Sequence, residues 1–397
     1  MFKKTQIIIG LFCIITFSCQ YLEPTAPSDD QTLDGPVPGL TQEQLRRFNA
    51  GDQAFNSEIF TSETGLGPLF VSNSCGSCHA ADGKGHPFST LTRFGQSDIN
   101  GNQFLHLGGP QLQHRALPGY KPEQLPAGAT FSKILPPANT GLGYIMYIPD
   151  DTLIQWSDPD DVNKDGISGR VNRIGIPWYV IPNPNASVEN GTYIGRLGKK
   201  AAVYNLLQQT ANAYNQDMGI TSTYEPKDAY TLLNIEPEVA DKTIADVVFY
   251  LETLKAPVPR KQNDPINQKG NALFSDLGCH KCHIPKTTTG PAPIAALAFR
   301  AIWSYSDFLL HDMGPLLDDG YTEGSATTSE WRTPPLWGLG LAKKSQGGKY
   351  FLLHDGRARS IEEAILWHGG EGEASKNKFL QLNAPEKQAL IQFLESL

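Results

Sequence analysis

Apolar residues recur at helical spacing directly before two pairs of closely spaced cysteines. In the first stretch, "LTQEQLRRFNAGDQAF", Leu45, Phe48 and Phe55 fall on one side of a helix. Thr41 and Gln44 have the spacing of a capping box, in which each side chain accepts a hydrogen bond from the other residue's backbone N–H. The pattern therefore predicts a helix that begins just after Thr41 and leads into the first cysteine pair.

The second stretch, "DPINQKGNALFSDLGC", has the same character. Asp264 is placed to cap the start of a helix, and Pro265 occupies its first position, where the missing N–H has no helical partner in any case. Ile266, Leu273 and Phe274 then form the apolar side. We expect a second helix here, which leads into the second cysteine pair.

Two further patterns occur once in each half of the chain, in the same order. "LPPANTGLG" (135–143) corresponds to "TPPLWGLG" (333–340). "ADVVFYLETL" (245–254) corresponds to the C-terminal "ALIQFLESL" (389–397), and both have helical apolar spacing. This order indicates a tandem duplication of one unit.

The boundary between the two units is expected in "KAPVPRKQNDP", which is proline-rich and charged as linkers commonly are. We therefore predict domains over residues 41–258 and 259–397, each long enough to form its own core. The first unit is the longer of the two.

The chain begins with "MFKKTQIIIGLFCIITFSC", a pattern typical of an export signal. Two lysines precede an apolar run over residues 7–17, which is shorter than the roughly 20 apolar residues of a permanent membrane span. Ser18 and Cys19 resemble a bacterial lipobox. We expect residues 1–18 to be removed and Cys19 to carry lipid; simple secretion is the alternative.

Several acyl chains on Cys19 would hold the protein at a membrane of the bacterial cell envelope, on the periplasmic side or at the cell surface. Residues 19–40 are polar and proline-rich, and we expect a flexible tether there. No other segment of the sequence is long and apolar enough to cross a membrane, so the rest is expected to be a soluble body.

The remaining cysteines all lie in Cys-x-x-Cys-His patterns: Cys75, Cys78 and His79 in "CGSCH", and Cys279, Cys282 and His283 in "CHKCH". This order is typical of covalent haem attachment, in which the thiols bind the haem and the histidine ligates the iron. A disulfide within each pair and a zinc site are the alternatives, although only the second motif has an extra histidine, His280. We expect two covalently bound c-type haems.

The formal net charge of the chain is −8 at pH 7, with the acidic excess spread along the sequence. This balance argues against nucleic acid as a partner and would suit a basic electron-donor protein. A solvated acidic surface without a partner gives the same pattern.

A possible cation site lies in "SDPDDVNKDGISGRVN". Asp161, Asn163 and Asp165 alternate and are followed by Gly166, which matches the first half of an EF-hand calcium loop. The twelfth position holds Asn172 instead of a bidentate glutamate, which disfavours a true EF-hand. Calcium binding and a turn whose side chains cap their own backbone are both open.

The motifs "CGSCHAADGKG", "GLGYIMYIP", "DVNKDGISGRVN", "GRLGKKA", "DMGITS", "CHKCH", "YSDFLLHDMGPLLDDG", "WRTPPLWGLG" and "HDGRARSIEEAILWHGGE" follow one another in this order. Together they resemble the di-haem oxidoreductase family of bacterial thiol oxidoreductases, which is similar to the bacterial di-haem cytochrome c peroxidases. The resemblance extends from about residue 40 to the C-terminus. It implies a mainly α fold of two tandem cytochrome c-like domains, with long loop insertions in the first.

The resemblance also implies ligands on the far side of the second iron. In the peroxidases this ligand follows an "HDG" segment and a short helix, and His368 stands at that place here. We therefore expect His283 and His368 to ligate the second iron. Met313 and His311 are competing candidates, and a surface histidine at a helix end is the alternative for His368.

Three residues of the same segment are candidates for contacts around the haem: His354 as a hydrogen-bonding group near the haem edge, and Arg357 and Arg359 as partners of the haem propionates. The alternative is that the side chains of Arg357 and Arg359 simply lie in water.

At the first haem, the peroxidases keep a distal carboxylate that transfers a proton while the O–O bond breaks. The resemblance places Asp217 there as the catalytic acid; a plain aspartate at a helix end is the alternative. The candidates for a sixth iron ligand instead are His86, His106, His114, Met146 and Met218. Met146 stands where relatives usually carry a glutamate.

Many relatives have an aromatic residue near "GRLGKKA" that helps electrons pass between the haems. Lys199 stands at about this position here, which puts that route in doubt. The tryptophans available to replace it are Trp156, Trp178, Trp303 and Trp337.

Two functions are consistent with these residues. The first is a membrane-tethered di-haem oxidoreductase of the peroxidase type, in which one haem relays electrons to the other, where a small oxidant such as hydrogen peroxide is reduced. The electrons would come from a small donor protein or a quinol-linked cytochrome. The second is a relay protein whose haems are both six-coordinate and which catalyses no reaction. A thiol oxidoreductase activity would need a free dithiol, and haem attachment leaves none.

Overall fold

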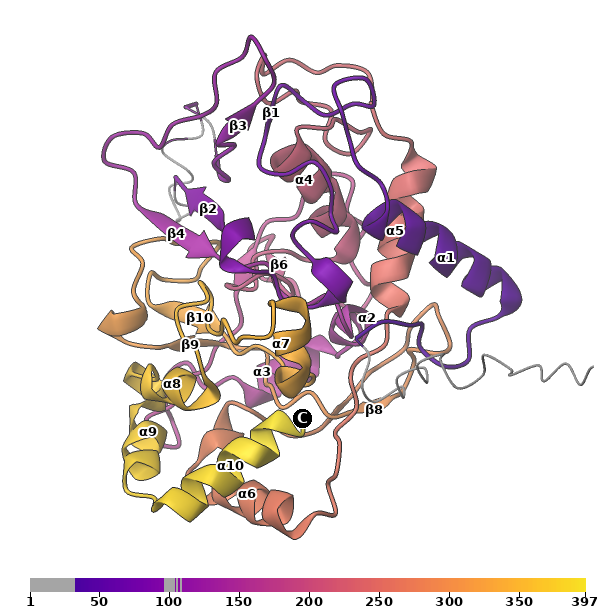
Figure 1. Cartoon of the computed structure of the whole chain (residues 1–397). Coiled ribbons are helices and arrows are strands. Elements are labelled where there is room, and N and C mark those ends of the chain that lie inside the picture. Colours follow the sequence, from indigo (N-terminus) through magenta and orange to yellow (C-terminus); the bar gives the residue numbers. More distant parts are fainter. Residues whose placement is uncertain (1–32, 96–103, 105, 108) are drawn as a thin grey trace, which may run out of the picture.

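The computed structural model describes residues 33–95, 104, 106–107 and 109–397. The expected signal, Cys19 and residues 19–32 of the expected tether lie outside these residues. The described chain is rich in helix and has only short strands, as the sequence predicts, and long irregular segments connect them (Figure 1).

The α-helices are α1 (Gln42–Asn56), α2 (Leu142–Met146), α3 (Asp150–Trp156), α4 (Leu206–Met218), α5 (Asp241–Thr253), α6 (Pro265–Asp276), α7 (Ala342–Ser345), α8 (Ile361–Leu366), α9 (Glu373–Leu380) and α10 (Ala384–Glu395). The short 3-10 helices are η3 (Ala80–Asp82), η4 (Pro87–Ser89), η5 (Cys279–Lys281), η6 (Pro315–Leu317), η7 (Leu339–Leu341) and η8 (Gly370–Gly372).

The strands form antiparallel pairs: β1 (Leu69–Phe70) with β3 (Arg115–Ala116), β2 (Leu91–Phe94) with β4 (Phe131–Ile134), β5 (Arg173–Ile174) with β6 (Tyr193–Ile194), β7 (Thr287–Thr288) with β8 (Ala301–Ile302), and β9 (Leu310–Asp312) with β10 (Glu330–Arg332). In the longest pair, Leu91 lies opposite Ile134 and Phe94 lies opposite Phe131.

Both predicted helix starts are confirmed. Thr41 and Gln44 form the capping box of α1, and the Asp264 side chain accepts a hydrogen bond from the backbone N–H of Ile266 at the start of α6. These caps satisfy N–H groups that have no partner within the helix, so the local sequence alone determines where each helix begins.

The two halves of the chain pair their helices in the same way. Helix α1 packs on α5 in one half, at the right of Figure 1, and α6 packs on α10 in the other half, at the bottom. Each crossing has a glycine in the first helix: a Cβ on Gly51 would lie 2.1 Å from the Asp246 carbonyl oxygen, and one on Gly270 would lie 2.2 Å from the Ala389 carbonyl oxygen. The repeat in the sequence is therefore a repeat of helix packing.

We expect Gly270→Ala to lower the free energy of unfolding by about 1–3 kcal/mol, because the added methyl group has no room against α10. Urea unfolding followed by far-UV circular dichroism measures this loss. Gly175→Ala is the matched control, since a Cβ there meets no atom within 4 Å. Equal stability of both variants would contradict the close packing of α6 and α10.

The segment before α1 corrects the predicted tether boundary at residue 40. The backbone N–H of Val37 donates to the carbonyl oxygen of Thr253 at 2.8 Å, and Val37 is only 1% exposed. It packs in the same apolar cluster as Phe48 and Phe55. Residues 33–40 thus belong to the packed body because Val37 contributes to its core.

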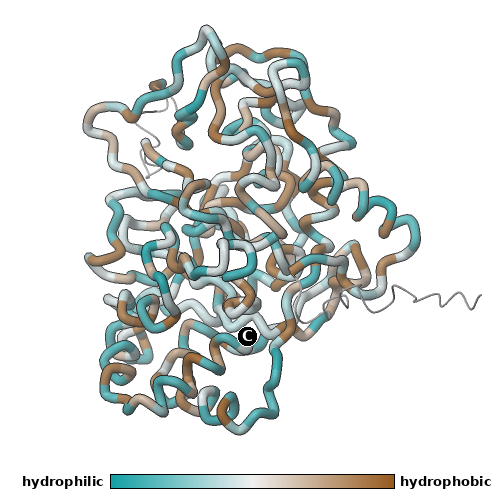
Figure 2. The backbone as a smooth tube through the Cα atoms, viewed as in Figure 1, coloured by the Kyte–Doolittle hydropathy of each residue, from teal (hydrophilic) through white to brown (hydrophobic). Residues whose placement is uncertain are grey.

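Apolar residues of the helices are buried in both halves of the chain. Figure 2 shows hydrophilic and hydrophobic residues interspersed along these segments. One cluster contains Phe55, Val247 and Tyr250, and another contains Phe274, Leu390 and Phe393.

Within the described residues, none of the helices has the length and apolar character of a membrane span. The division into two cytochrome c-like domains stays a prediction.

Candidate functional site

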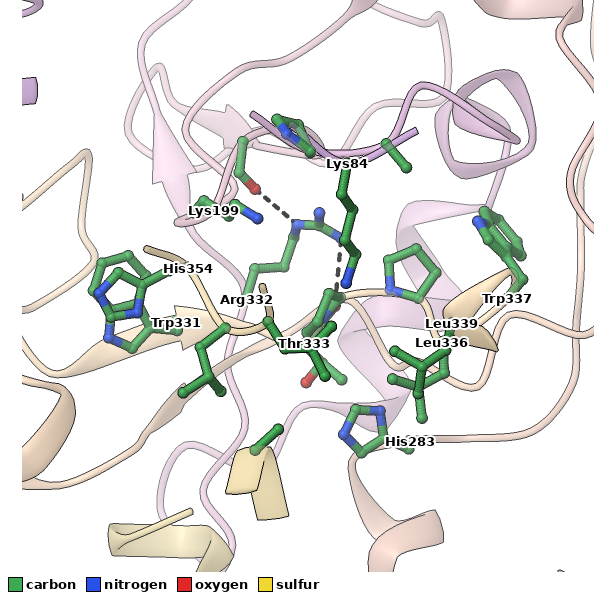
Figure 3. A pocket seen from close by; sticks show the side chains of 18 of the residues that line it. Lys84, Lys199, His283, Trp331, Arg332, Thr333, Leu336, Trp337, Leu339 and His354 are labelled. Carbon is green, nitrogen blue, oxygen red and sulfur yellow. Dashed lines mark hydrogen bonds between the residues drawn. The ribbon is translucent and has the colours of Figure 1, made fainter. Parts of the chain in front are cut away.

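One continuous cavity, with a volume of about 380 Å³, is lined by residues of both Cys-x-x-Cys-His motifs. They are Cys75 and His79 of the first motif and Cys279, Cys282 and His283 of the second. Figure 3 shows part of this cavity, with His283 at one side. The two motifs are about two hundred positions apart in the sequence, yet they open into the same space.

The first motif follows α1 as a tight turn. The Cys75 carbonyl oxygen accepts hydrogen bonds from the backbone N–H groups of Cys78 at 3.1 Å and His79 at 3.0 Å. The Nδ1 atom of His79 lies 3.0 Å from the Pro137 carbonyl oxygen, and burial lowers the pKa of His79 to about 4. A neutral imidazole with Nδ1 held by a carbonyl presents Nε2 as a metal ligand.

The second motif repeats this arrangement. The backbone N–H of His283 donates to the Cys279 carbonyl oxygen at 2.9 Å, and its Nδ1 lies 3.0 Å from the Tyr305 carbonyl oxygen. Burial lowers the pKa of His283 to about 4, and the nearby His368 contributes to this lowering to a smaller extent. The His283 ring lies 6.4 Å from Phe274, as the His79 ring lies 5.9 Å from Phe55. Both motifs are thus built to present one neutral imidazole to the cavity.

The motif cysteines form no disulfide in the described part of the chain. Burial raises the pKa of Cys75 to about 12 and that of Cys279 to about 11. Reactive and zinc-binding cysteines need a thiolate, which these surroundings disfavour. His280, the extra histidine that a zinc site would use, is exposed.

His368 follows α8 and lines the cavity together with His283. Its Nδ1 lies 2.8 Å from the Ala364 carbonyl oxygen, and burial lowers its pKa. His368 therefore has the same features as the two motif histidines: a neutral ring, a fixed Nδ1 and an available Nε2. Met313, one of the competing candidates, also lines the cavity.

His311, the other competing candidate, has both ring nitrogens engaged. Its Nε2 lies 2.8 Å from Asp307 and its Nδ1 lies 2.6 Å from Glu371, and His311 is only 3% exposed. Burial alone would lower the pKa of His311, but its hydrogen bonds to Asp307, Cys282 and Glu371 hold it well above the ordinary value. A protonated imidazole between two carboxylates has no lone pair for iron, so His311 is a poor ligand.

His311 also belongs to a group of potential metal ligands with Cys282 and Asp307, whose ligand atoms lie within 4.8 Å of one another. The two carboxylates that hold the imidazole explain this group as an ion-pair network. It fixes the position of Cys282, whose sulfur lies 3.7 Å from the Nδ1 atom of His311.

Asp217 lies at the end of α4 and lines the cavity. Its side chain accepts a hydrogen bond from the Gln111 amide, and its carbonyl oxygen accepts bonds from Val71 at 2.7 Å and Ser72 at 3.0 Å. Burial raises the pKa of Asp217 to about 6, against the lowering effects of Gln111 and Arg93. A carboxyl group that titrates near neutrality is suited to take up and release a proton.

None of the other candidates for a sixth ligand at the first motif lines the cavity. Met218 is 2% exposed and packs against Phe60 and Ile220, and Met146 packs in the cluster around Phe55. His86 stacks on Phe88 and meets the Phe351 ring edge to face. His106 and His114 are exposed. The first motif therefore presents His79 to the cavity without a second histidine or methionine from this set.

The cavity wall also carries polar atoms that are buried and lack a hydrogen-bond partner: Asn139 Nδ2, Thr140 Oγ1, Thr210 Oγ1 and the Tyr214 hydroxyl. Such atoms cost free energy unless a ligand or water binds them. The motif histidines, the neighbouring thiols and these polar atoms together fit a bound prosthetic group such as haem.

Residues 135–397 match the family model described as "Di-haem oxidoreductase, putative peroxidase". The chain belongs to this family. The resemblance seen in the sequence is confirmed, although the match begins after the first motif. Membership implies two haems and supports an enzyme.

A comparison with the curated proteins gives no match. Among solved structures, the diheme peroxidase BthA from Burkholderia thailandensis is similar at 14% identity and a TM-score of 0.41, covering 91% of this chain and 86% of that chain. Hydrazine synthase from Kuenenia stuttgartiensis is similar at 14% identity and a TM-score of 0.39 over 100% of both chains. A MauG-like protein associated with microbial copper homeostasis is similar at 18% identity and a TM-score of 0.33, covering 65% and 89%.

Of the tryptophans proposed to carry electrons in this di-haem oxidoreductase, only Trp337 lines the cavity. Trp178 and Trp303 are 80% and 46% exposed. Trp156 packs against the same apolar cluster as Trp337 but does not line the cavity. Trp331 also lines the cavity and is missing from the predicted set. It stacks on His354 with 3.7 Å between ring centroids (Figure 3).

The residues predicted around the haem edge lie partly elsewhere. Arg357 binds Asp355 and covers the Trp367 ring, and Arg359 covers the Phe351 ring, so neither lines the cavity. His354 does line it, with Nε2 held by Asp319 at 2.9 Å. Among the described residues, the Lys and Arg side chains that line the cavity are Lys84, Lys199, Arg332 and Lys376, and Lys376 is paired with Glu373.

The calcium-like loop lies beside the second motif. Asp161, Asn163 and Asp165 accept hydrogen bonds from backbone N–H groups of their own loop, as in a capped turn. Asp165 also forms an ion pair with Lys281 at 3.0 Å, and the loop continues to Ser168, which donates to Glu371. Calcium binding stays a prediction, and the loop's observed contacts connect the first half of the chain to the second haem motif.

Proposed function

We propose that this di-haem oxidoreductase holds two covalently attached c-type haems and reduces a small oxidant such as hydrogen peroxide. The first haem site comprises Cys75, Cys78 and His79, and the second comprises Cys279, Cys282 and His283. The second haem passes electrons to the first, where the oxidant is reduced.

A single observation carries this proposal: both motifs open into one cavity, and the candidates for a second strong ligand at the first site all lie outside it. A haem ligated only by His79 keeps a free face for a substrate. The relay alternative needs a strong ligand on both faces of both haems, and the described residues around His79 offer a carboxylate instead.

When bound, the haems supply the two electrons that reduce hydrogen peroxide. Asp217 takes a proton from one peroxide oxygen and gives it to the other, which leaves as the first water molecule. Two further protons from solvent and the two electrons, which the external donor replaces, convert the remaining oxygen into the second water molecule. His283 and His368, both with Nδ1 bound to a backbone carbonyl, would hold the second iron through their Nε2 atoms.

The location and partners follow from the sequence pattern. A lipid anchor on Cys19 would hold the enzyme at a membrane of the bacterial cell envelope, on the periplasmic side or at the cell surface. The acidic balance suits a small basic electron donor or a quinol-linked cytochrome.

We expect the double substitution Cys279→Ser and Cys282→Ser to reduce the covalent haem content from two per chain to one and to abolish peroxide reduction with an external donor. The reason is that the thioether bonds of the second haem can no longer form. A pyridine haemochrome assay of the purified protein measures the content.

His280→Ala is the matched control, because His280 lies between these cysteines but is exposed. It should retain two haems. Fewer than two haems in the unsubstituted protein, or two bound zinc ions by metal analysis, would overturn the proposed function.

A further inference from the structure

Three cationic side chains from distant parts of the chain converge in the cavity. Lys84 follows η3, Lys199 lies between β6 and α4, and Arg332 ends β10. Figure 3 shows their side chains directed toward one another on the side of the cavity away from His283. Their convergence is a feature of the tertiary structure, because Lys84 and Arg332 are separated by most of the chain.

None of these cations forms an ion pair among the described residues; Asp355 acts on Lys199 and Asp307 acts on Arg332 only at longer range. Arg332 donates only to carbonyl oxygens, Nε to Gly198 at 2.9 Å and Nη1 to Thr333 at 3.3 Å. Burial lowers the pKa of Lys199 to about 7, and the charges of Lys84 and Arg332 contribute to this lowering to a smaller extent. Burial also lowers the pKa of Lys84 to about 8. Three mutually repelling cations therefore share a site that disfavours charge.

The neighbouring Lys200 is a buried lysine whose amine has a full set of hydrogen-bond acceptors. Its Nζ donates to the carbonyl oxygens of Thr327, Thr328 and Glu330 and lies over the Trp331 ring. Within the described residues, Lys84 and Lys199 have no such set of acceptors, and both face the cavity. Lys84, Lys199 and Arg332 are each half-buried, and cations withdrawn from water without a close anion are unfavourable, so an anion is expected in the space between them.

The carboxylates already in the cavity cannot fill this role. Glu371 is bound to His311, and Asp217 is bound to Gln111. The haems of the proposed function each carry two propionates, which are carboxylates that a cation cluster can bind by charge-assisted hydrogen bonds. The cavity that contains both haem sites is the one that contains the cations.

We propose that Lys84, Lys199 and Arg332 form a clamp that binds the haem propionates between the two haem sites. The inference rests on the proposed function. The clamp positions both cofactors and raises their midpoint potentials, because a nearby positive charge stabilises the reduced, less positive haem.

The test is a spectroelectrochemical titration of the haem-loaded protein. Lys84→Met, Lys199→Met and Arg332→Met each remove one cation while keeping a long side chain. Each variant should shift the midpoint potential of at least one haem to a more negative value. The shift should persist at high salt, because ions in solution screen buried charges poorly.

Two controls separate charge from structure. Lys349→Met removes the same charge from an exposed position away from the cavity and should leave both midpoint potentials unchanged. Lys199→Arg keeps the charge and should retain the potentials of the unsubstituted protein. An equal shift in Lys199→Arg and Lys199→Met would overturn the clamp.

The two proposals fail in different ways. If the unsubstituted protein carries two haems but all three cation variants keep its midpoint potentials, the clamp is wrong and the proposed function stands. If the haemochrome assay finds fewer than two haems in the unsubstituted protein, the proposed function fails and the clamp fails with it.

Discussion

Asp217→Asn is expected to lower kcat/KM for hydrogen peroxide by about 10²–10⁴-fold, the contribution typical of a positioned acid–base group. The asparagine keeps the shape and the hydrogen bond to Gln111 but cannot accept the peroxide proton. Asp217→Glu should restore part of the activity. Steady-state kinetics with a reduced electron donor measures each value.

The pH profile gives a second, independent readout. Burial raises the pKa of Asp217 to about 6, so the proportion of ionised carboxylate rises as the pH increases through 6. Since the ionised form takes the proton from the peroxide, kcat/KM should rise over the same interval and lose this step in Asp217→Asn. Asp151→Asn, at an exposed position on α3, is the control and should keep the step. A profile that is unchanged in Asp217→Asn would remove Asp217 from the mechanism.

The same raised pKa has a consequence for stability. A carboxyl group whose pKa is higher in the folded protein than in the unfolded chain binds its proton more tightly when folded. Its contribution is therefore fully present below the ordinary pKa near 3.8 and is lost as the pH rises through about 6. At neutral pH the Asp217 carboxylate is therefore available for proton transfer but no longer contributes this stability, as is common for functional groups with a shifted pKa.

The parts of the fold that the sequence predicts correctly are those determined within a few residues. The caps at Thr41 and Asp264 act on N–H groups of their own first turn, so they are visible in a short window. The two Cys-x-x-Cys-His motifs are equally local. Their repetition, together with Gly51 and Gly270 at the helix crossings, indicates the shared packing of the two halves.

The two histidine candidates for the second haem site show a limit of prediction from the sequence. His311 and His368 are both histidines in the second half, and only the resemblance to the family favours His368 over His311. The structure distinguishes the two side chains through Glu371, which lies 60 positions from His311 and occupies its Nδ1. A contact of this kind depends on how η8 and β9 meet, which a pattern within either segment does not contain.

The cavity cations were missed for the same reason. Lys199 was visible only as a departure from the family pattern, and Lys84 and Arg332 look like ordinary surface residues in the sequence. The predicted propionate partners, Arg357 and Arg359, lie in a motif of the family but bind Asp355 and aromatic rings instead. Electrostatic sites assembled from several loops need the tertiary structure before their members can be named.

Replacement of His368 by glycine is expected to convert the second haem from a low-spin to a high-spin state and to stop electron delivery to the first haem. His368 and His283 line the same cavity, and each has Nδ1 bound to a carbonyl, so that both Nε2 atoms are available to one iron. Loss of one strong ligand opens the iron to solvent and alters its potential. Electron paramagnetic resonance and electronic spectra of the oxidised protein detect the change.

Two further measurements make this expectation decisive. Imidazole added to His368→Gly should restore the low-spin signal, because the substitution leaves a space of the shape of the lost ring. Met313→Leu, which removes one of the two competing candidates that line the cavity, should leave the spectrum unchanged. If Met313→Leu abolishes the low-spin signal and His368→Gly retains it, the ligand is Met313, and His368 is a buried histidine held by Ala364.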